Sequence, residues 1–365
     1  MHALRSTRKL RQSGPRSIPK TLVALVSASL LLAACGSGSG AATSTGSAPA
    51  SGKASTAPAN LKVGVYPGAL MSLPAYVGAE AGIFEKHGLD VDLVDISDGR
   101  NMTAAVASGS IDLELNGMDN NALAIEGGQS IVAVAGNTSR PVFTLIASSK
   151  LNTPNLEAGF PASVQDLKGK KIGVMATGGS VEQMLRYVLK AAGLDPDKDV
   201  TLINAGLPAT GVPALKANQI DAYMSIEPSA SLTSLDGSGK IVLDLRKSPL
   251  PTELVALDWP YNQWASTKKT VEAKRDAMSK FQAAMKDVHA FLADSTNRAK
   301  VKEIAMAKIS DKSELVDQLL DTNIEAFGFE LPRDRVERAF EYLTKTGLVK
   351  KSLAYEDYVA EGARS

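Results

Sequence analysis

The sequence predicts an α/β protein built from two similar lobes, each a mainly parallel sheet flanked by helices. From Leu61 onwards, apolar strand-like segments alternate with helical segments, as in parallel sheets whose faces are covered by helices. The same order of segments returns from Lys171 onwards. Beyond residue 252, long segments carry apolar residues at helical spacing, and we expect them to complete the fold.

The first copy of this pattern lies between positions 61 and 135. Alternating or continuous aliphatic residues predict strands at 61–66, 91–96, 111–115 and 131–135. Helical spacing predicts helices at 74–86, 101–108 and 121–127. Gly88 follows the first of these helices, where a glycine commonly ends a helix by adopting the left-handed conformation.

The second copy repeats both the residue types and their spacing. The interval from Gly64 to Asp112 is the same as the interval from Gly173 to Asp221. The constant offset that takes Gly64 to Gly173 also aligns 132–134 with 241–243. Any two sheets of this class share the alternation, but not the repeated spacing. We therefore expect two lobes of the same construction.

The chain is predicted to cross between the two lobes twice. Segments 271–294, 313–327 and 333–345 show helical spacing, and their Met and Phe residues are expected to be core. We assign residues 61–145 and 252–365 to the first lobe and 146–251 to the second. Two crossing segments would then join the lobes.

Residues 1–34 have the features of an export signal. They carry six basic residues and no acidic ones, and an apolar run extends from Thr21 to Ala34. This run is short for a membrane span of about 20 residues, but suits a signal peptide. Leu32-Ala33-Ala34-Cys35 resembles a lipoprotein cleavage site, at which Cys35 would be lipidated. The alternative is an ordinary signal peptide with a chance cysteine.

Composition narrows the possible functions. Residues 35–60 are mostly Gly, Ser, Ala, Thr and Pro and predict a flexible linker. The net charge of +1 falls to −5 once the six basic residues of segment 1–34 are removed, and neither value indicates nucleic-acid binding. The single cysteine excludes an internal disulfide and a cysteine-rich zinc site. No metal and no cofactor are predicted.

A ligand site is expected where the parallel strands of both lobes end, because ligands of open α/β sheets bind outside the carboxyl ends of strands. Glycines before the helix at 181–191, with Ser180 as its cap, would suit an anionic group. Arg140 could pair with an anion, and Glu227 could accept hydrogen bonds from an amine or cap a helix. The candidate ligand-binding residues are Tyr66, Gly68, Leu70, Asn116, Asp119, Asn137, Thr138, Arg140, Thr177, Gly178, Gly179, Ser180 and Glu227.

Several short motifs in this order resemble the solute-binding proteins of ABC importers, in the group that binds nitrate, sulfonates, taurine and thiamine precursors. They lie at 74–78, 82–84, 109–112, 167–174, 193–195 and 218–222, and at Glu227-Pro228. The resemblance implies the type II periplasmic-binding-protein fold, closure of the lobes on a small solute, and delivery to a permease and its ATPase. We expect a monomer outside the cytoplasm, held to a bacterial membrane by Cys35 if the lipoprotein cleavage site is used. Ile226 and Ser229 stand where the family often has aromatic residues.

Two alternatives remain open at this point. One is an enzyme on the same fold, although the only cysteine is Cys35 and the only histidines are His2, His87 and His289. No HExxH, GxSxG or Walker motif is present. The other is a lipid-tethered sensory domain that binds a ligand without serving a permease.

Overall fold

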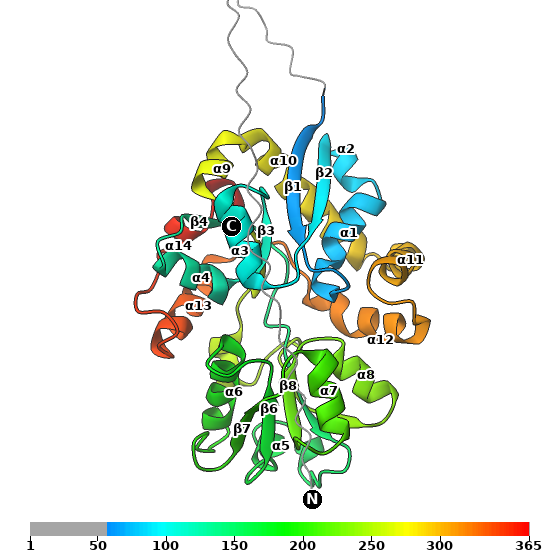
Figure 1. Ribbon diagram of the computed structural model, residues 1–365, viewed down its shortest axis with the longest axis vertical. Helices are drawn as coiled ribbons and strands as arrows, with labels where there is room; N and C mark the ends of the chain where they lie inside the picture. The colour runs from blue at the N-terminus through cyan, green and yellow to red at the C-terminus, as the bar shows by residue number, and fades with distance from the viewer. Residues whose placement is uncertain (1–56, 365) are drawn as a thin grey trace, which may run out of the picture. The chain divides into compact units, whose positions relative to one another are not determined.

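The computed structural model describes residues 57–364 (Figure 1). The predicted signal segment, Cys35 and most of the predicted linker lie outside the described residues. None of the helices within residues 57–364 combines the length and the apolar character needed to cross a membrane.

The first lobe contains two small sheets. Parallel strands β1 (Ala59–Val65) and β2 (Leu89–Asp95) form one sheet. In the other, β10 (Asn262–Thr267) runs antiparallel between β3 (Glu114–Gly117) and β4 (Ile131–Gly136). An isolated bridge between Val63 and Leu113 connects β1 to the chain just before β3. This single bridge joins the edge of one small sheet to the edge of the other.

The second lobe contains one continuous sheet of five strands in the order β7-β6-β8-β5-β9. Strands β6, β7 and β8 are parallel, and β5 runs antiparallel between β8 and β9. The strands are β5 (Thr144–Ser148), β6 (Lys171–Val174), β7 (Thr201–Asn204), β8 (Ala222–Ser225) and β9 (Gly239–Asp244).

The repeat predicted from the sequence is confirmed at the level of strand register. Val63 pairs with Leu93 in the first lobe, and Ile172 pairs with Leu202 in the second. Gly64 and Gly173 are equivalent as well. A Cβ atom on either would lie 2.8 or 2.6 Å from the Cδ1 atom of Ile111 or Ile220, respectively. The equivalent isoleucine therefore approaches both glycines closely, and Met102 Sδ would lie nearer still to a Cβ atom on Gly64.

Helices surround both sets of strands, and the predicted α/β class is confirmed. The C-terminal helices return to the first lobe, where α10 and α11 contact α1 (Figure 1, yellow and orange beside blue). The helices up to residue 235 are α1 (Leu73–Glu80), α2 (Ile83–Lys86), α3 (Gly99–Ser108), α4 (Met118–Glu126), α5 (Ala162–Gln165), α6 (Ser180–Ala191), α7 (Pro208–Lys216) and α8 (Ser229–Leu235). The later ones are α9 (Lys268–Ala273), α10 (Arg275–Ala293), α11 (Arg298–Lys308), α12 (Ser313–Asn323), α13 (Arg333–Lys345) and α14 (Tyr355–Tyr358).

Some predicted boundaries were wrong. The single helix predicted at 74–86 is two helices, because Gly82 adopts a left-handed conformation with φ of 66° between α1 and α2. The helix predicted at 271–294 is divided at Lys274, whose φ and ψ of −116° and 34° are not helical. The strand predicted at 111–115 begins only at Glu114. The antiparallel strands β5 and β10 were not predicted. The lobe limits drawn from the sequence stay a prediction.

Candidate functional site

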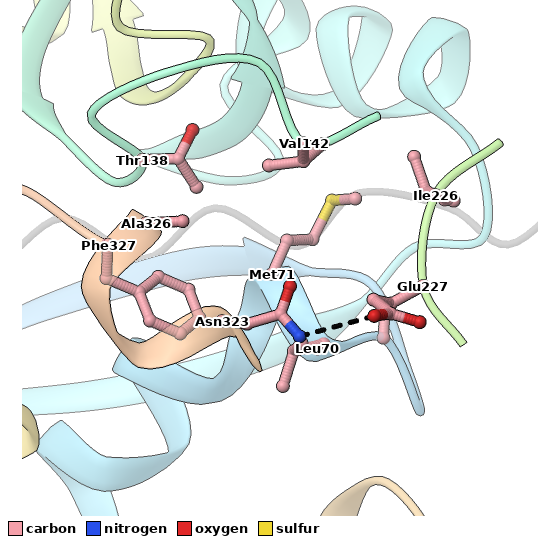
Figure 2. A pocket seen from close by; sticks show the side chains of 10 residues that line it. Leu70, Met71, Thr138, Val142, Ile226, Glu227, Asn323, Ala326 and Phe327 are labelled. Carbon is pink, nitrogen blue, oxygen red and sulfur yellow. Dashed lines mark hydrogen bonds between the residues drawn. The ribbon is translucent and has the colours of Figure 1, made fainter. Parts of the chain in front are cut away.

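A pocket lies where loops of both lobes meet. The loops after β1 and β4 and the end of α12 supply its first-lobe wall, and the loop after β8 supplies its second-lobe wall. It contains about 420 Å³ of space, part of it continuous with solvent. The sequence-predicted candidates Leu70, Thr138 and Glu227 all line it (Figure 2). The structure thus brings candidates from both lobes together here.

Most of the pocket wall is apolar. Its apolar lining residues are Ala69, Leu70, Met71, Val142, Ile226, Ala326 and Phe327. Three residues add polar groups, namely Thr138, Glu227 and Asn323. Figure 2 shows the Asn323 amide from α12 facing the Glu227 carboxylate from the loop after β8. Polar contact with a ligand would therefore be concentrated at a few points on an otherwise apolar surface.

Glu227 is held in place by donors from its own lobe. Its Oε1 atom accepts hydrogen bonds from Arg246 Nη1 and from Ser231 Oγ, the latter at 3.0 Å. Among the described residues, its Oε2 atom accepts only the Ser231 backbone N–H, at 3.1 Å. A carboxylate offers about four lone-pair sites, so Oε2 retains the capacity to accept another hydrogen bond.

Arg246 is a buried cation that sequence reasoning missed. Its Nε and Nη2 atoms donate to Asp244 at 2.7 and 2.8 Å, and Nη1 also donates to Asn323 Oδ1 at 2.9 Å. Burial opposes its charge, but the hydrogen bonds and charges of Asp244 and Glu227 outweigh burial and raise the pKa of Arg246 above its ordinary value. The sequence repeat could have indicated Arg246. The offset that takes Gly64 to Gly173 also takes Asn137, a candidate ligand-binding residue, to position 246.

Asn323 connects the lobes at this point. It ends α12 in the first lobe, and its amide contacts Arg246 and Glu227 of the second lobe at 2.9 and 3.4 Å. Nothing in the helical spacing of 313–327 distinguished it from a surface asparagine.

Thr138 lines the first-lobe side of the pocket, whereas Asn137, its neighbour in the chain, is fully buried and does not line it. Thr138 Oγ1 accepts the Asn262 backbone N–H at 2.9 Å. Asn137 Nδ2 donates to the Met71 carbonyl at 3.0 Å, while Asn137 Oδ1 is buried without a hydrogen-bond partner among the described residues. Because the Met71 carbonyl can only accept, the unpartnered atom of Asn137 is the oxygen.

Arg140 does not line this pocket. Its Nη1 atom donates to the Arg246 carbonyl at 3.4 Å, and its Nε atom lies 3.9 Å from Asp258 Oδ1. Arg335 also pairs with Asp258, at 2.6 Å. Burial lowers the pKa of Arg140, and the Asp258 charge partly offsets that effect. The predicted anion partner is thus directed to a carboxylate of its own protein.

A second group of candidates surrounds Asp119. Tyr261 donates its hydroxyl to Asp119 Oδ2 at 3.2 Å, and the Asp119 side chain is only 2% exposed. Burial raises the pKa of Asp119, whereas Ser180 and Tyr261 act to lower it. Burial, followed by the charges of Glu114 and Asp119, raises the pKa of Tyr66. Tyr66, Asp119 and Ser180 therefore influence one another electrostatically, although none of them lines the pocket in Figure 2.

Two further candidates, Asn116 and Gly68, have features that maintain the local structure of the first lobe. The Asn116 amide donates to Gly99, Thr103 and Glu114, and its oxygen accepts from Gly117 and Asn120. This leaves the side chain fully hydrogen-bonded within the protein. Gly68 is exposed with φ of 69°, a conformation that favours glycine in the turn after β1.

Glu114 is a buried carboxylate that sequence reasoning also missed. Its Oε2 atom accepts from Thr103 Oγ1 at 3.1 Å and from Asn116 Nδ2 at 3.2 Å, while Oε1 has no hydrogen-bond partner among the described residues. Burial raises the pKa of Glu114 to about 7, because neither neighbour carries a compensating charge. An acidic residue inside the apolar run at 111–115 was the available signal.

The segment from Thr177 to Gly179 precedes α6, and Ser180, the first residue of α6, does not cap the helix as predicted. Gly179 is the N-cap residue, and no side chain makes a capping hydrogen bond there. Instead Glu182, in the first turn, accepts the Gly178 N–H at 2.8 Å and pairs with Arg186 at 2.6 Å. The prediction that Ser180 caps the helix was wrong because Ser180 is itself the first helical residue. Thr177 and Gly178 are exposed.

Among residues 57–364, no cluster of three or more His, Cys, Asp or Glu side chains is arranged to hold a metal ion.

Comparison with known proteins identifies the family. The NMT1/THI5-like family model matches residues 71–299. A Haemophilus influenzae protein, provisionally named for thiamine biosynthesis, is 24% identical over 293 residues, which cover 78% of this chain and 86% of its own. The 4-amino-5-hydroxymethyl-2-methylpyrimidine phosphate synthase THI11 of Saccharomyces cerevisiae is 26% identical over 155 residues, 42% of each chain.

A solved structure supports the fold. The periplasmic aliphatic sulphonate-binding protein SsuA of Escherichia coli superposes with a TM-score of 0.66 at 18% identity. The superposition covers 84% of this chain and 99% of SsuA. The predicted resemblance and the periplasmic-binding-protein-like fold are confirmed: the chain belongs to the NMT1/THI5-like family.

Proposed function

We propose that this protein is the solute-binding component of an ABC importer, and that it captures a small molecule between its lobes and delivers it to a permease. The observation that carries the proposal is the pocket in Figure 2, whose wall comes from both lobes. Solute-binding proteins on this fold work by hinge closure, in which the ligand favours the closed state. A pocket divided between lobes is formed fully only when the lobes are together.

The hinge would consist of the segments that cross between the lobes. The chain leaves the first lobe after β4 and enters the second at β5, and it returns between β9 and β10. Polar contacts such as Asn323 to Arg246 are the kind that break when the lobes separate and form again when they close. A monomer suffices for this cycle.

Ligand binding by the intact chain tests the proposal. We would measure thermal stability against sulfonates, nitrate, taurine, pyrimidines, amino acids and aromatic acids. A ligand present at about 100 times its dissociation constant should stabilise the protein by about 2.7 kcal/mol. Small-angle scattering should show compaction with the same ligand. A ligand that raises stability without compaction would contradict the hinge mechanism.

We further propose that Cys35 carries a lipid that holds the protein at the outer face of a bacterial membrane. The support is its position directly after an apolar run and its being the only cysteine in the chain. Mass spectrometry of the chain from membranes should show a diacylglycerol mass at a new N-terminal cysteine. The Cys35→Ser variant should lose that mass, and detection of Cys35 as a free thiol in the wild type would refute the anchor.

The similarity to the yeast synthase favours one alternative, an enzyme acting on a pyrimidine precursor. This similarity spans less than half of either chain, and the sequence has no cysteine after Cys35. Mass spectrometry of the protein after incubation with its ligand separates the two functions. A carrier returns the ligand unchanged, and a chemically altered ligand would establish an enzyme.

A further inference from the structure

We infer that the pocket takes a solute with an apolar body and an N–H donor group, such as an amine or an amidine, and rejects oxyanions such as sulfonate and nitrate. This inference rests on the proposed function and specifies the class of its ligand. It is carried by Glu227, Arg246 and the residues that line the pocket.

The first argument is the charge of the wall. Glu227 is the only charged residue among the ten that line the pocket. The Arg246 cation behind it already donates from all three guanidinium nitrogens, to Asp244, Glu227 and Asn323. An entering oxyanion would therefore meet a carboxylate and find no free cation on the lining, whereas stable burial of an anion requires pairing or several donors.

The second argument concerns the two anion sites that the sequence had suggested. Arg140 is directed to Asp258 and lies outside the lining. The N-terminus of α6 already carries Glu182, whose carboxylate accepts the Gly178 N–H and is only 7% exposed. A second negative charge at this helix terminus would be repelled by the first.

The third argument is the supply of acceptors. Among residues 57–364, Glu227 Oε2 accepts one hydrogen bond, from the Ser231 backbone N–H. This oxygen can accept another hydrogen bond but cannot donate one. Leu70, Met71 and Phe327 offer an apolar surface to the rest of the ligand. An acceptor beside an apolar wall fits a ligand whose polar group donates.

Calorimetry with matched probes tests this assignment in the intact chain. Propylamine, benzamidine and 4-aminopyrimidine are compared with propanesulfonate, benzenesulfonate and nitrate. We expect binding in the first set only. Glu227→Gln should weaken that binding about tenfold or more, because a hydrogen bond to a charged acceptor is lost.

Glu182→Gln is the matched control. It makes the same change in another buried carboxylate paired with an arginine, but away from the pocket. Its affinity should stay within about twofold of the wild type, since distant sites act independently. Equal losses in both variants would overturn the role given to Glu227.

The remaining outcomes separate this inference from the proposed function. Binding of the sulfonates or nitrate, with compaction, would overturn the ligand class and leave the carrier function standing. If an amino acid or an aromatic acid compacts the protein and no amine or amidine probe does so, the ligand class is likewise overturned and the carrier function stands. Absence of binding by every compound in both panels would overturn the ligand class and the carrier function together.

Discussion

The two lobes share strand order and register, yet equivalent buried positions can hold very different side chains. The repeat makes Glu114 on β3 equivalent to Tyr223 on β8, and both side chains are fully buried. Tyr223 fills the space beside Gly211 and donates its hydroxyl to the Gly206 carbonyl at 2.6 Å. Within residues 57–364, the hydrogen-bond donors to Glu114 are the neutral side chains of Thr103 and Asn116.

The sheets differ at the same place. In the second lobe, β8 pairs with β6 over three residues, whereas in the first lobe one bridge connects β1 to the chain before β3. The residues that follow the repeat therefore form the strands common to both lobes. Where the first lobe departs from the repeat, it buries polar groups without partners among the described residues. Buried unpaired charge costs stability, so these positions of the first lobe should make its stability depend on pH.

The largest expected effect is the loss of Tyr223. Tyr223→Ala should reduce the free energy of unfolding by about 3–5 kcal/mol, because a large side chain is removed from a closely packed core. Glu114→Ala at pH 8 should cost much less, since it also removes a buried charge. Urea unfolding of both variants measures the difference, and equal costs would mean that the two positions are energetically equivalent.

Glu114 should make stability fall as pH rises. Its pKa is raised from 4.5 to about 7 in the folded protein, so its contribution is complete below about pH 4.5 and is lost as pH increases through about 7. The total change is about 3 kcal/mol. In Glu114→Gln this change should disappear. Unfolding curves between pH 5 and pH 8 test it, and parallel pH profiles for variant and wild type would contradict it.

His289 should act in the opposite direction. It lies on α10, and neither ring nitrogen has a hydrogen-bond partner among residues 57–364. Burial lowers its pKa from 6.5 to about 4. Its contribution is complete above about pH 6.5 and is lost as pH falls toward 4, by about 3 kcal/mol. His289→Met should be more resistant to acid than the wild type. An unchanged acid transition would show that His289 is not the group responsible.

The strands and the repeat were predictable because alternation and spacing are local properties of the chain. Strands β5 and β10 were missed because neither belongs to the alternation of parallel strands and helices. Each pairs antiparallel with strands that are distant in the sequence. The strand-end rule found Thr138 and Glu227. It could not show that Arg140 faces Asp258, or that Glu227 is held by Arg246, because such pairings depend on side-chain directions set by the complete fold.

The smallest expected effect compares two aspartates that the repeat makes equivalent. Asp112 accepts the Lys62 backbone N–H at 2.9 Å, and Asp221 accepts the Lys171 N–H at 2.8 Å. Asp112 also pairs with Lys274 at 2.7 Å. Asp112→Asn should therefore cost more than Asp221→Asn, by less than about 1 kcal/mol, because a partly exposed ion pair contributes little.

A double-mutant cycle with Lys274→Met isolates that pair. Its coupling energy should account for the difference between the two aspartates. If Asp221→Asn proved the more costly change, the backbone hydrogen bond shared by both lobes would matter more in the second. The continuous sheet around β6 and β8 would then depend on this contact more strongly than the divided sheets of the first lobe do.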